Sequence, residues 1–490
     1  MALERKILTL VQPTLAVDEM STIDTTDPNA ALKSNDTDPL MAKKAGALYP
    51  LVQINGYQLG ENEIVSLRLD ETGFIPVVSV TMAMTNGIFL SNHFPKDGDP
   101  ISIFIKSKTD EFKPIRADFD ITSVTSAPSA DESGDAILFT FEGTLRILGL
   151  FSEKCKAFSE MTSMETLTQI ASDLKMGFAS NETSTSDKMT WICPFDTYDK
   201  FVKDVTMASF KSDGDFYQSW IDHFYFLNFV NVNSQFSEEL DIEAALEVLT
   251  QDQDFFKGRE VQKIDTTMTL SNHKTLRGMG QFINSYTVLN NAGQITIDNG
   301  FRRYTQFYDS FSGGDPANKY QSHFSEGLNT AGVTDKILLK GRVNPNKNLR
   351  AVDDKYFKEH NKYKWMGVQE SLPKGNVHSD YLFSQIHNWQ NGQELEKMYM
   401  RVTLGKVNFN LYRGQRIPVI IINEGTNRQK ATAEPAQNEN IQVSADKFLS
   451  GYYMIRGMRY AWSYTDAIFK HDVFLTRREW PIPNIKNLPA

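Results

Sequence analysis

The residues that could carry catalytic or metal chemistry are scattered along this chain of 490 residues. Its eight histidines stand at no metal-ligand spacing with an acid or a cysteine. The sequence also lacks G-x-S-x-G and H-E-x-x-H motifs. Gly327 and Gly332 have the glycine spacing of a phosphate loop, but Val333 replaces the lysine that would reach the phosphates. The sequence therefore predicts no catalytic, cofactor-binding or metal-binding residue.

Two acid pairs, Asp97 with Asp99 and Asp213 with Asp215, are typical of turns. Neither has the further oxygen ligands of a calcium loop. Glycoside hydrolysis, however, needs only two carboxylates at a suitable separation. A carbohydrate-binding or glycan-cleaving β-sandwich protein, with tryptophans and tyrosines that stack on sugars, therefore stays open as an alternative function.

Composition limits the class of protein. The chain has 51 Lys and Arg against 61 Asp and Glu, a formal charge of −10, so binding that rests on neutralised phosphates is disfavoured. Its only cysteines, Cys155 and Cys193, exclude a disulfide scaffold, and isolated cysteines usually act as small buried apolar residues. No apolar run approaches the ~20 residues of a membrane span, and the apolar run near the start is too short for a secretory signal.

The elements that would position any site divide the chain into five parts. Residues 1–45 are expected to form a flexible arm, because no apolar periodicity persists there. Residues 46–150 are expected to form a first β-barrel. Its short alternating runs are separated by turn formers such as Asp70-Glu-Thr-Gly and Asp97-Gly-Asp-Pro; the runs lie at 64–69, 77–82, 101–105, 119–124 and 137–141.

Residues 151–236 are expected to form an α+β domain. A capping box at Thr162 and Glu165 begins a helix that reaches Leu174, with Gly177 as its left-handed C-cap residue. A second helix begins at about Asp196. The aromatic run from 220 to 232 predicts one strand that is buried on both faces.

Residues 237–378 are expected to be an irregular β-rich insertion. It would contain a short helix at 242–249 and strands at 285–289 and 294–297, joined by a turn at 290–293. Residues 379–490 are expected to form a second β-barrel with a C-terminal tail. This part would open with a helix around Tyr381 and a strand at 398–404.

The second barrel repeats the strand pattern of the first. Residues 98–104 and 414–420 each place a turn glycine before an alternating strand. The strand at 118–124 matches 453–460, and the one at 137–143 matches 469–478. Two related β-domains are therefore expected in one chain.

This order of parts resembles the baseplate central hub proteins of contractile-tailed bacteriophages, which are related to the hub portion of type VI secretion spike proteins. The resemblance rests on two β-domains around an α+β unit and on three stretches: 162–178 with 191–195, 225–232, and 449–483. It implies a β-rich α+β multidomain fold, with two tube-type antiparallel β-barrels flanking an α+β domain and a β-rich insertion.

The resemblance also implies a function without enzymatic activity or cofactors. Three chains would form a homotrimer whose six barrels make a pseudo-sixfold ring in the virion tail baseplate, assembled in the host cytoplasm. The ring would join the tail tube or tube-initiator proteins above it to a central spike below it. Wedge proteins and the tape measure are further implied contacts, and DNA would pass through without specific binding. Another tail or wedge adaptor is the remaining alternative.

Overall fold

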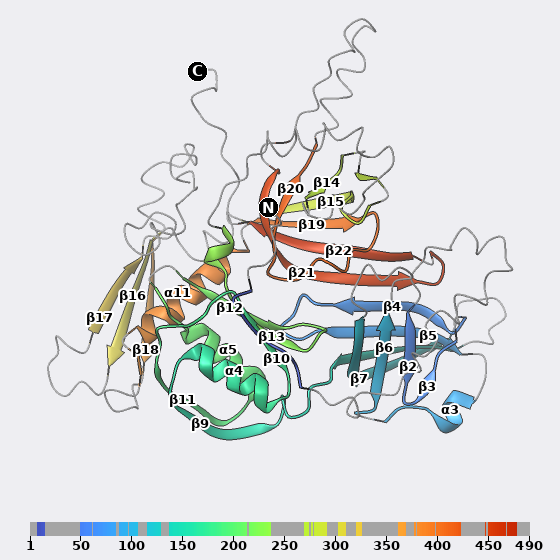
Figure 1. The fold of residues 1–490 in the computed structure, drawn as a ribbon, viewed down its shortest axis with the longest axis horizontal. Helices are drawn as coiled ribbons and strands as arrows, with labels where there is room; N and C mark the ends of the chain where they lie inside the picture. Colours follow the sequence, from blue (N-terminus) through green and yellow to red (C-terminus); the bar gives the residue numbers. More distant parts are fainter. Residues whose placement is uncertain are drawn as a thin grey trace, which may run out of the picture.

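The computed structural model shows a β-rich α+β protein organised around one large sheet (Figure 1). It describes residues 7–14, 50–60, 62–84, 88–96, 98–105, 115–128, 137–212, 215–236, 269–273, 276–277, 279–291, 302–309, 320–325, 361–368, 377–378, 380–396, 398–422, 446, 449–466 and 468–477. The large sheet has 13 strands and contains strands from both predicted barrels. The predicted β-rich multidomain fold class is therefore confirmed.

The first half of the large sheet comes from residues 51–145. Its neighbours run in the order β4–β5–β8–β7–β6–β2–β3. A short helix, α3 (Ile88–Asn92), lies between β5 and β6 and places Phe89 in the core. The strands are β2 (Leu51–Ile54), β3 (Tyr57–Gln58), β4 (Ile64–Asp70), β5 (Val77–Met84), β6 (Pro100–Ile105), β7 (Ile115–Pro128) and β8 (Ile137–Leu145).

The second half has the order β15–β19–β22–β21–β20–β14. A bridge between Ser271 and Phe282, the residue before β15, brings the two ends of this half close together. The strands are β14 (Leu270–Ser271), β15 (Ile283–Asn290), β19 (Met398–Leu404), β20 (Arg416–Ile420), β21 (Gly451–Ser463) and β22 (Ile468–Arg477). Strands β14 and β15 lie in this half of the sheet, although the sequence assigned them to the insertion.

The two halves repeat one strand order. Numbered along the chain, β2, β4, β5, β6, β7 and β8 occupy the places of β14, β15, β19, β20, β21 and β22. Positive-φ glycines precede the equivalent strands β6 and β20: Gly98 at 81° and Gly414 at 80°. One pair differs, because β2 runs antiparallel to β6 whereas β14 runs parallel to β20. The predicted internal repeat is therefore present in the strand order.

Bulges mark the same places in both halves. The pairing of β4 with β5 shifts at Val65, and that of β15 with β19 shifts at Asn284. The pairing of β7 with β8 shifts at Thr122, and that of β21 with β22 shifts at Arg456. These bulges set the two halves in register residue by residue, because a bulge fixes which residues oppose each other.

The α+β part contains two helices, α4 (Ser163–Asp173) and α5 (Tyr198–Ala208), next to two small sheets. The capping box at Thr162 and Glu165 is present. The sheets are β1–β10–β13–β12 and the ribbon β9–β11. The strands are β1 (Thr9–Val11), β9 (Glu153–Met161), β10 (Gly177–Ser180), β11 (Met189–Thr197), β12 (Tyr217–Ile221) and β13 (Phe226–Asn231), followed by a 3₁₀ turn, η2 (Asn233–Phe236).

Three sequence expectations are corrected here. Lys175, not Gly177, has the left-handed backbone after α4, with φ 57°. Gly177 begins β10, where a Cβ would lie 2.5 Å from the Phe226 ring. The run from 220 to 232 is a hairpin, because the Asp222 side chain accepts backbone N–H groups that stabilise a turn. Residues 9–11 of the expected arm are a strand paired with β10. Most of the remaining arm lies outside the described residues.

A third part comes from the segment between β15 and β19. Its three-stranded sheet has the order β17–β16–β18, with β16 (Arg302–Asp309), β17 (Tyr320–Ser325) and β18 (Asn361–Val368). Helix α11 (Tyr381–Glu394) follows and packs on α5 of the α+β part, although the sequence assigned it to the second barrel. The expected helix at 242–249 and strand at 294–297 lie outside the described residues.

Candidate functional site

Strand β21 joins the two halves of the large sheet edge to edge. Strand β21 is 13 residues long, and β22 covers one of its edges. On the other edge its first residues pair with β20 and its last residues pair with β4, from Arg459 opposite Asp70 to Ser463 opposite Ser66. We call this antiparallel contact the internal junction. Figure 1 shows β21 along β4.

Asp70 is the charged centre of the internal junction. Its Oδ2 accepts hydrogen bonds from Arg68 Nη2 at 2.8 Å and from Arg459 Nε at 2.9 Å. Its Oδ1 accepts the backbone N–H of Thr72 at 3.0 Å and the Thr72 hydroxyl at 2.6 Å. Burial alone would raise the pKa of this carboxyl group, but these hydrogen bonds outweigh it and lower the pKa from 3.8 to about 2. Asp70 is therefore ionised at neutral pH.

The apolar side of the internal junction is fully covered. Tyr460 and Trp462 of β21 are 1% and 3% exposed, and the opposing Leu69 and Leu67 of β4 are 0% and 1% exposed. The Tyr460 ring stacks on His471 with centroids 4.4 Å apart. Because burial lowers the pKa of His471 to about 3, this imidazole is neutral and its Nδ1 accepts the backbone N–H of Asn408 at 3.3 Å.

The α+β part docks on the internal junction through the turn of the β12–β13 hairpin. His223 Nδ1 contacts the Glu71 carboxylate, and the backbone N–H of His223 donates to the same oxygen at 3.3 Å. The hydroxyl of Tyr225 accepts the backbone N–H of Asp118, in β7, at 2.9 Å. This turn therefore ties the α+β part to the residue after β4 and to strand β7 of the first half of the sheet.

The loop before β20 completes the contact. Arg413 donates to the backbone carbonyls of Glu71 and Gly73, and its guanidinium lies 4.8 Å from the Trp220 ring centroid. Burial lowers the pKa of Arg413 to about 10. At Gly414 a Cβ would lie 2.5 Å from the same tryptophan ring. The arrangement fixes the two sheet halves and the α+β part in one relative orientation, which is a mechanical role.

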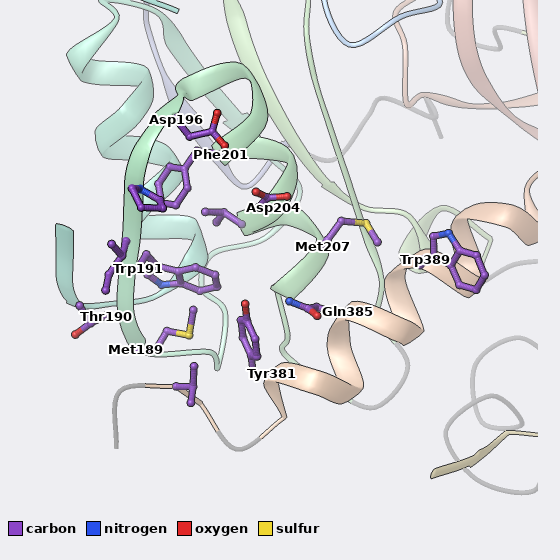
Figure 2. A pocket seen from close by; sticks show the side chains of 14 residues that line it. Met189, Thr190, Trp191, Asp196, Phe201, Asp204, Met207, Tyr381, Gln385 and Trp389 are labelled. Atoms are coloured by element: carbon purple, nitrogen blue, oxygen red, sulfur yellow. The ribbon is translucent and has the colours of Figure 1, made fainter. Parts of the chain in front are cut away.

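A cavity of about 630 Å³ is the second candidate site (Figure 2). It lies between β11, α5 and α11. Asp196 of β11 and Asp204 of α5 supply two carboxylates, and burial, followed by the charge of Asp196, raises the pKa of Asp204. The residues lining it are Met189, Thr190, Trp191, Ile192, Pro194, Asp196, Phe201, Asp204, Val205, Met207, Val377, Tyr381, Gln385 and Trp389.

The aromatic walls of this cavity serve mainly as core. Trp191 and Phe201 are 3% and 5% exposed, and Trp191 Nε1 donates to the Met161 carbonyl at 2.9 Å. Only Tyr381 and Trp389, both half-buried on α11, offer partly open aromatic faces. The cavity therefore combines an acidic end with a small aromatic surface.

Of the residues considered from the sequence, His223 and His471 lie at the internal junction, and Cys193 donates to the carbonyl of Asp196, which lines the cavity. The two acid pairs have other roles. Asp99 accepts the backbone N–H of Lys96, and Asp215 accepts the Ser212 hydroxyl, so both serve turns; Asp97 and Asp213 lie outside the described residues. Cys155 and Cys193 are free thiols on adjacent strands, but only Cys193 is buried as expected. The described residues contain no group of three His, Cys, Asp or Glu that could hold a metal ion.

Sequence reasoning missed the junction residues. Asp70 and Glu71 were interpreted only as turn formers, and their partners Arg459 and His223 lie far away along the chain. Within the described parts of the chain, no helix has the length and apolarity that crossing a membrane requires.

Several solved structures are similar to this chain. A tail protein from Neisseria meningitidis has 12% sequence identity and a TM-score of 0.46, covering 88% of this chain and 97% of that one. A 43 kDa tail protein of prophage MuSo2 from Shewanella oneidensis has 9% identity and a TM-score of 0.46, covering 88% and 99%. An Escherichia coli component of the type VI secretion system has 9% identity and a TM-score of 0.38, covering 88% and 80%.

Phage tail proteins and type VI secretion proteins, the two groups named by the sequence resemblance, are thus among the structural neighbours of the chain. No model of a known protein family matches the sequence, and no curated protein matches it.

Proposed function

We propose that this chain is a structural protein of a phage-type tail, and specifically the central hub of its baseplate. The observation that carries the proposal is the internal junction. It presents two β-units of one strand order, side by side, in a single chain. Three such chains would present six similar units, which is what an adaptor between a sixfold tube and a threefold spike requires.

In this role the homotrimer forms an annulus in the virion baseplate. One face seats the tail tube or its initiator proteins, and the other seats the central spike. Wedge proteins and the tape measure are further partners, and DNA moves through the opening. The net charge of −10 per chain supports such a passage, because a negative wall does not retain a polyanion.

The proposal is tested by the size and shape of the purified full-length protein. We expect a particle of three times the 55.6 kDa chain mass in sedimentation equilibrium, and a ring in negative-stain images. We also expect co-elution with the spike encoded in the same genome. A protein that stays monomeric at about 100 μM and binds no spike would contradict the hub assignment.

The acidic cavity supports a second candidate, a glycan-binding or glycan-cleaving function. Two carboxylates and the partly open rings of Tyr381 and Trp389 are the groups that sugar recognition uses. Incubation with cell-wall and capsular glycans tests it, with Asp204→Asn as the matched variant. Cleavage or binding that this variant abolishes would favour the second candidate over a purely structural hub.

A further inference from the structure

Each strand of the internal junction has an equivalent in the other half of the sheet. In the described residues these two equivalent strands do not pair with each other. Strand β7 is the equivalent of β21, and β15 is the equivalent of β4. Within the chain β21 pairs with β4. The same contact made once more would join β7 of one copy to β15 of another copy, since a contact between two equivalent units can repeat from unit to unit.

The pairing of β7 with β6 ends at the position equivalent to the one where the pairing of β21 with β20 ends. β6 pairs with β7 as far as Asp120, and the next N–H, of Ile121, donates to Asp99 at 3.2 Å. β20 pairs with β21 as far as Met454, and the N–H of Ile455 donates to Gln415 at 2.8 Å. Beyond this point β21 takes β4 as its partner. Among the described residues, no strand takes the corresponding edge of β7.

The side chains at the end of β7 are exposed, as expected for a strand edge that no other strand covers. Thr125, Ser126, Ala127 and Pro128 are all exposed, whereas Tyr460 and Trp462, the equivalents of Ser126 and Pro128, are almost fully buried. Since Pro128 has no N–H to donate, a ladder on this edge would end there.

Strand β15 is open in the same way. β19 covers one of its edges, and on the other the only described contact is the bridge at Phe282, before the strand begins. Thr287 is exposed, Val288 is half-buried, and Leu289 is 51% exposed. Their equivalents in β4 are Arg68, Leu69 and Asp70, which β21 covers.

We infer that the β7 segment from Thr125 to Ala127 of one copy pairs antiparallel with the β15 segment from Thr287 to Leu289 of a second copy of this chain. The bulges give the register. Thr125 lies three residues after its bulge, as Arg459 does, and Leu289 lies five residues after its bulge, as Asp70 does. Thr125 of one chain therefore opposes Leu289 of the next. This surface specifies the contact of the proposed homotrimer and in that respect rests on the proposed function.

The pair type follows from the hydrogen bonds of the internal junction. The N–H of Glu71 donates to Met458, and the N–H of Tyr464 donates to Val65. Arg459 and Asp70 lie between these bonds, so they form a non-hydrogen-bonded pair, whose Cα atoms lie about 4.5 Å apart. The equivalent pair, Thr125 and Leu289, has the separation that a disulfide accepts.

The test is site-directed disulfide formation in the full-length protein with Cys155→Ser as background. T125C/L289C should oxidise to a covalent species of three chains that a reductant dissolves. S126C/L289C is the matched control, because a slip of one residue turns the two side chains to opposite faces. We expect the control to cross-link about tenfold more slowly. Mixed T125C and L289C single variants should stop at two linked chains, which shows that the bond lies between chains.

Three outcomes are distinguishable. Rapid cross-linking of T125C/L289C alone supports the β7–β15 contact. A trimer in which neither pair cross-links, or both do equally, overturns this contact but leaves the hub assignment standing. A monomer without cross-links overturns both.

Discussion

Asp70 shows how one carboxylate at the internal junction ties stability to pH. Its pKa is 3.8 when unperturbed and about 2 in the fold. A carboxyl group whose pKa is lower in the fold stabilises the fold fully at pH values above its unperturbed pKa. This stabilisation is lost as the pH falls from about 4 to about 2. The shift corresponds to about 2 kcal/mol. Asp70→Asn should therefore lower the free energy of unfolding by about this amount at pH 7 and reduce its pH dependence below pH 4.

Urea unfolding at several pH values, followed by circular dichroism, measures this effect. Asp466→Asn is the control, because Asp466 makes an exposed ion pair with Lys470 at 2.7 Å. Exposed pairs contribute about 0.5 kcal/mol or less. Equal effects of the two substitutions would contradict the assignment of Asp70 as the charged centre of the internal junction.

The equivalent glycines of the repeat separate backbone strain from packing. Gly98 and Gly414 have φ of 81° and 80°, but a Cβ meets no atom within 4 Å at Gly98 and lies 2.5 Å from the Trp220 ring at Gly414. Gly98→Ala should cost about 1 kcal/mol from backbone strain alone. Gly414→Ala should cost about 2–4 kcal/mol, because it also displaces the tryptophan. Thermal unfolding of the two variants compares their losses of stability. Equal losses would show that the Trp220 ring moves aside without a cost in free energy.

At the scale of elements, α11 is held on the α+β part by polar side chains. Asn388 Nδ2 donates to the carbonyls of Met207 at 2.8 Å and Ser209 at 3.0 Å, and its Oδ1 accepts the N–H of Tyr217 at 2.9 Å. Asn388→Ala leaves these buried groups unpaired and should cost about 2–3 kcal/mol. Ser384→Ala, which removes one bond to Ala208 at 2.9 Å, should cost about 1 kcal/mol.

Hydrogen exchange of the α11 amides provides the measurement. It should rise strongly for Asn388→Ala and slightly for Ser384→Ala, while the amides of β5 and β8 stay protected. Uniform acceleration across the chain would mean that α11 does not open as a separate unit.

Local signals in the sequence were sufficient for several elements. The capping box at Thr162 was predictable because its two hydrogen bonds join residues three apart. The turns at Gly98 and Gly414 were predictable because glycine readily adopts the positive φ that such turns require. The hairpin turn at Asp222 was not predicted, because the aromatic run around it hides the turn and a single side chain stabilises it.

Long-range contacts were beyond the reach of the sequence. Arg459 donates to Asp70 across 389 positions, and no local pattern at either residue indicates the other as its partner. The pairing of β14 with β20 and the packing of α11 on α5 likewise join elements that lie far apart in the chain. The internal repeat was predictable from strand patterns. The pairing of β21 with β4, which joins the two halves, was not, because it depends on contacts between distant parts of the chain.

At the scale of the whole molecule, the two junctions of the proposed ring differ in charge. The internal junction carries the Arg459–Asp70 ion pair, with Nη2 and Oδ2 2.8 Å apart. The equivalent residues of the contact between copies are Thr125 and Leu289, which carry no charge. The chains themselves repel one another, because each has a formal charge of −10.

Salt should therefore strengthen the assembly. Raising the ionic strength from about 20 mM to about 200 mM screens the repulsion between chains, while the neutral β7–β15 contact has no ion pair to lose. The dissociation constant of the trimer should fall by about threefold or more, as measured by sedimentation equilibrium. The variant Leu289→Asp, which adds a negative charge at this contact, should weaken the trimer most at low salt. A trimer that dissociates as salt rises would instead place an ion-paired surface between the copies.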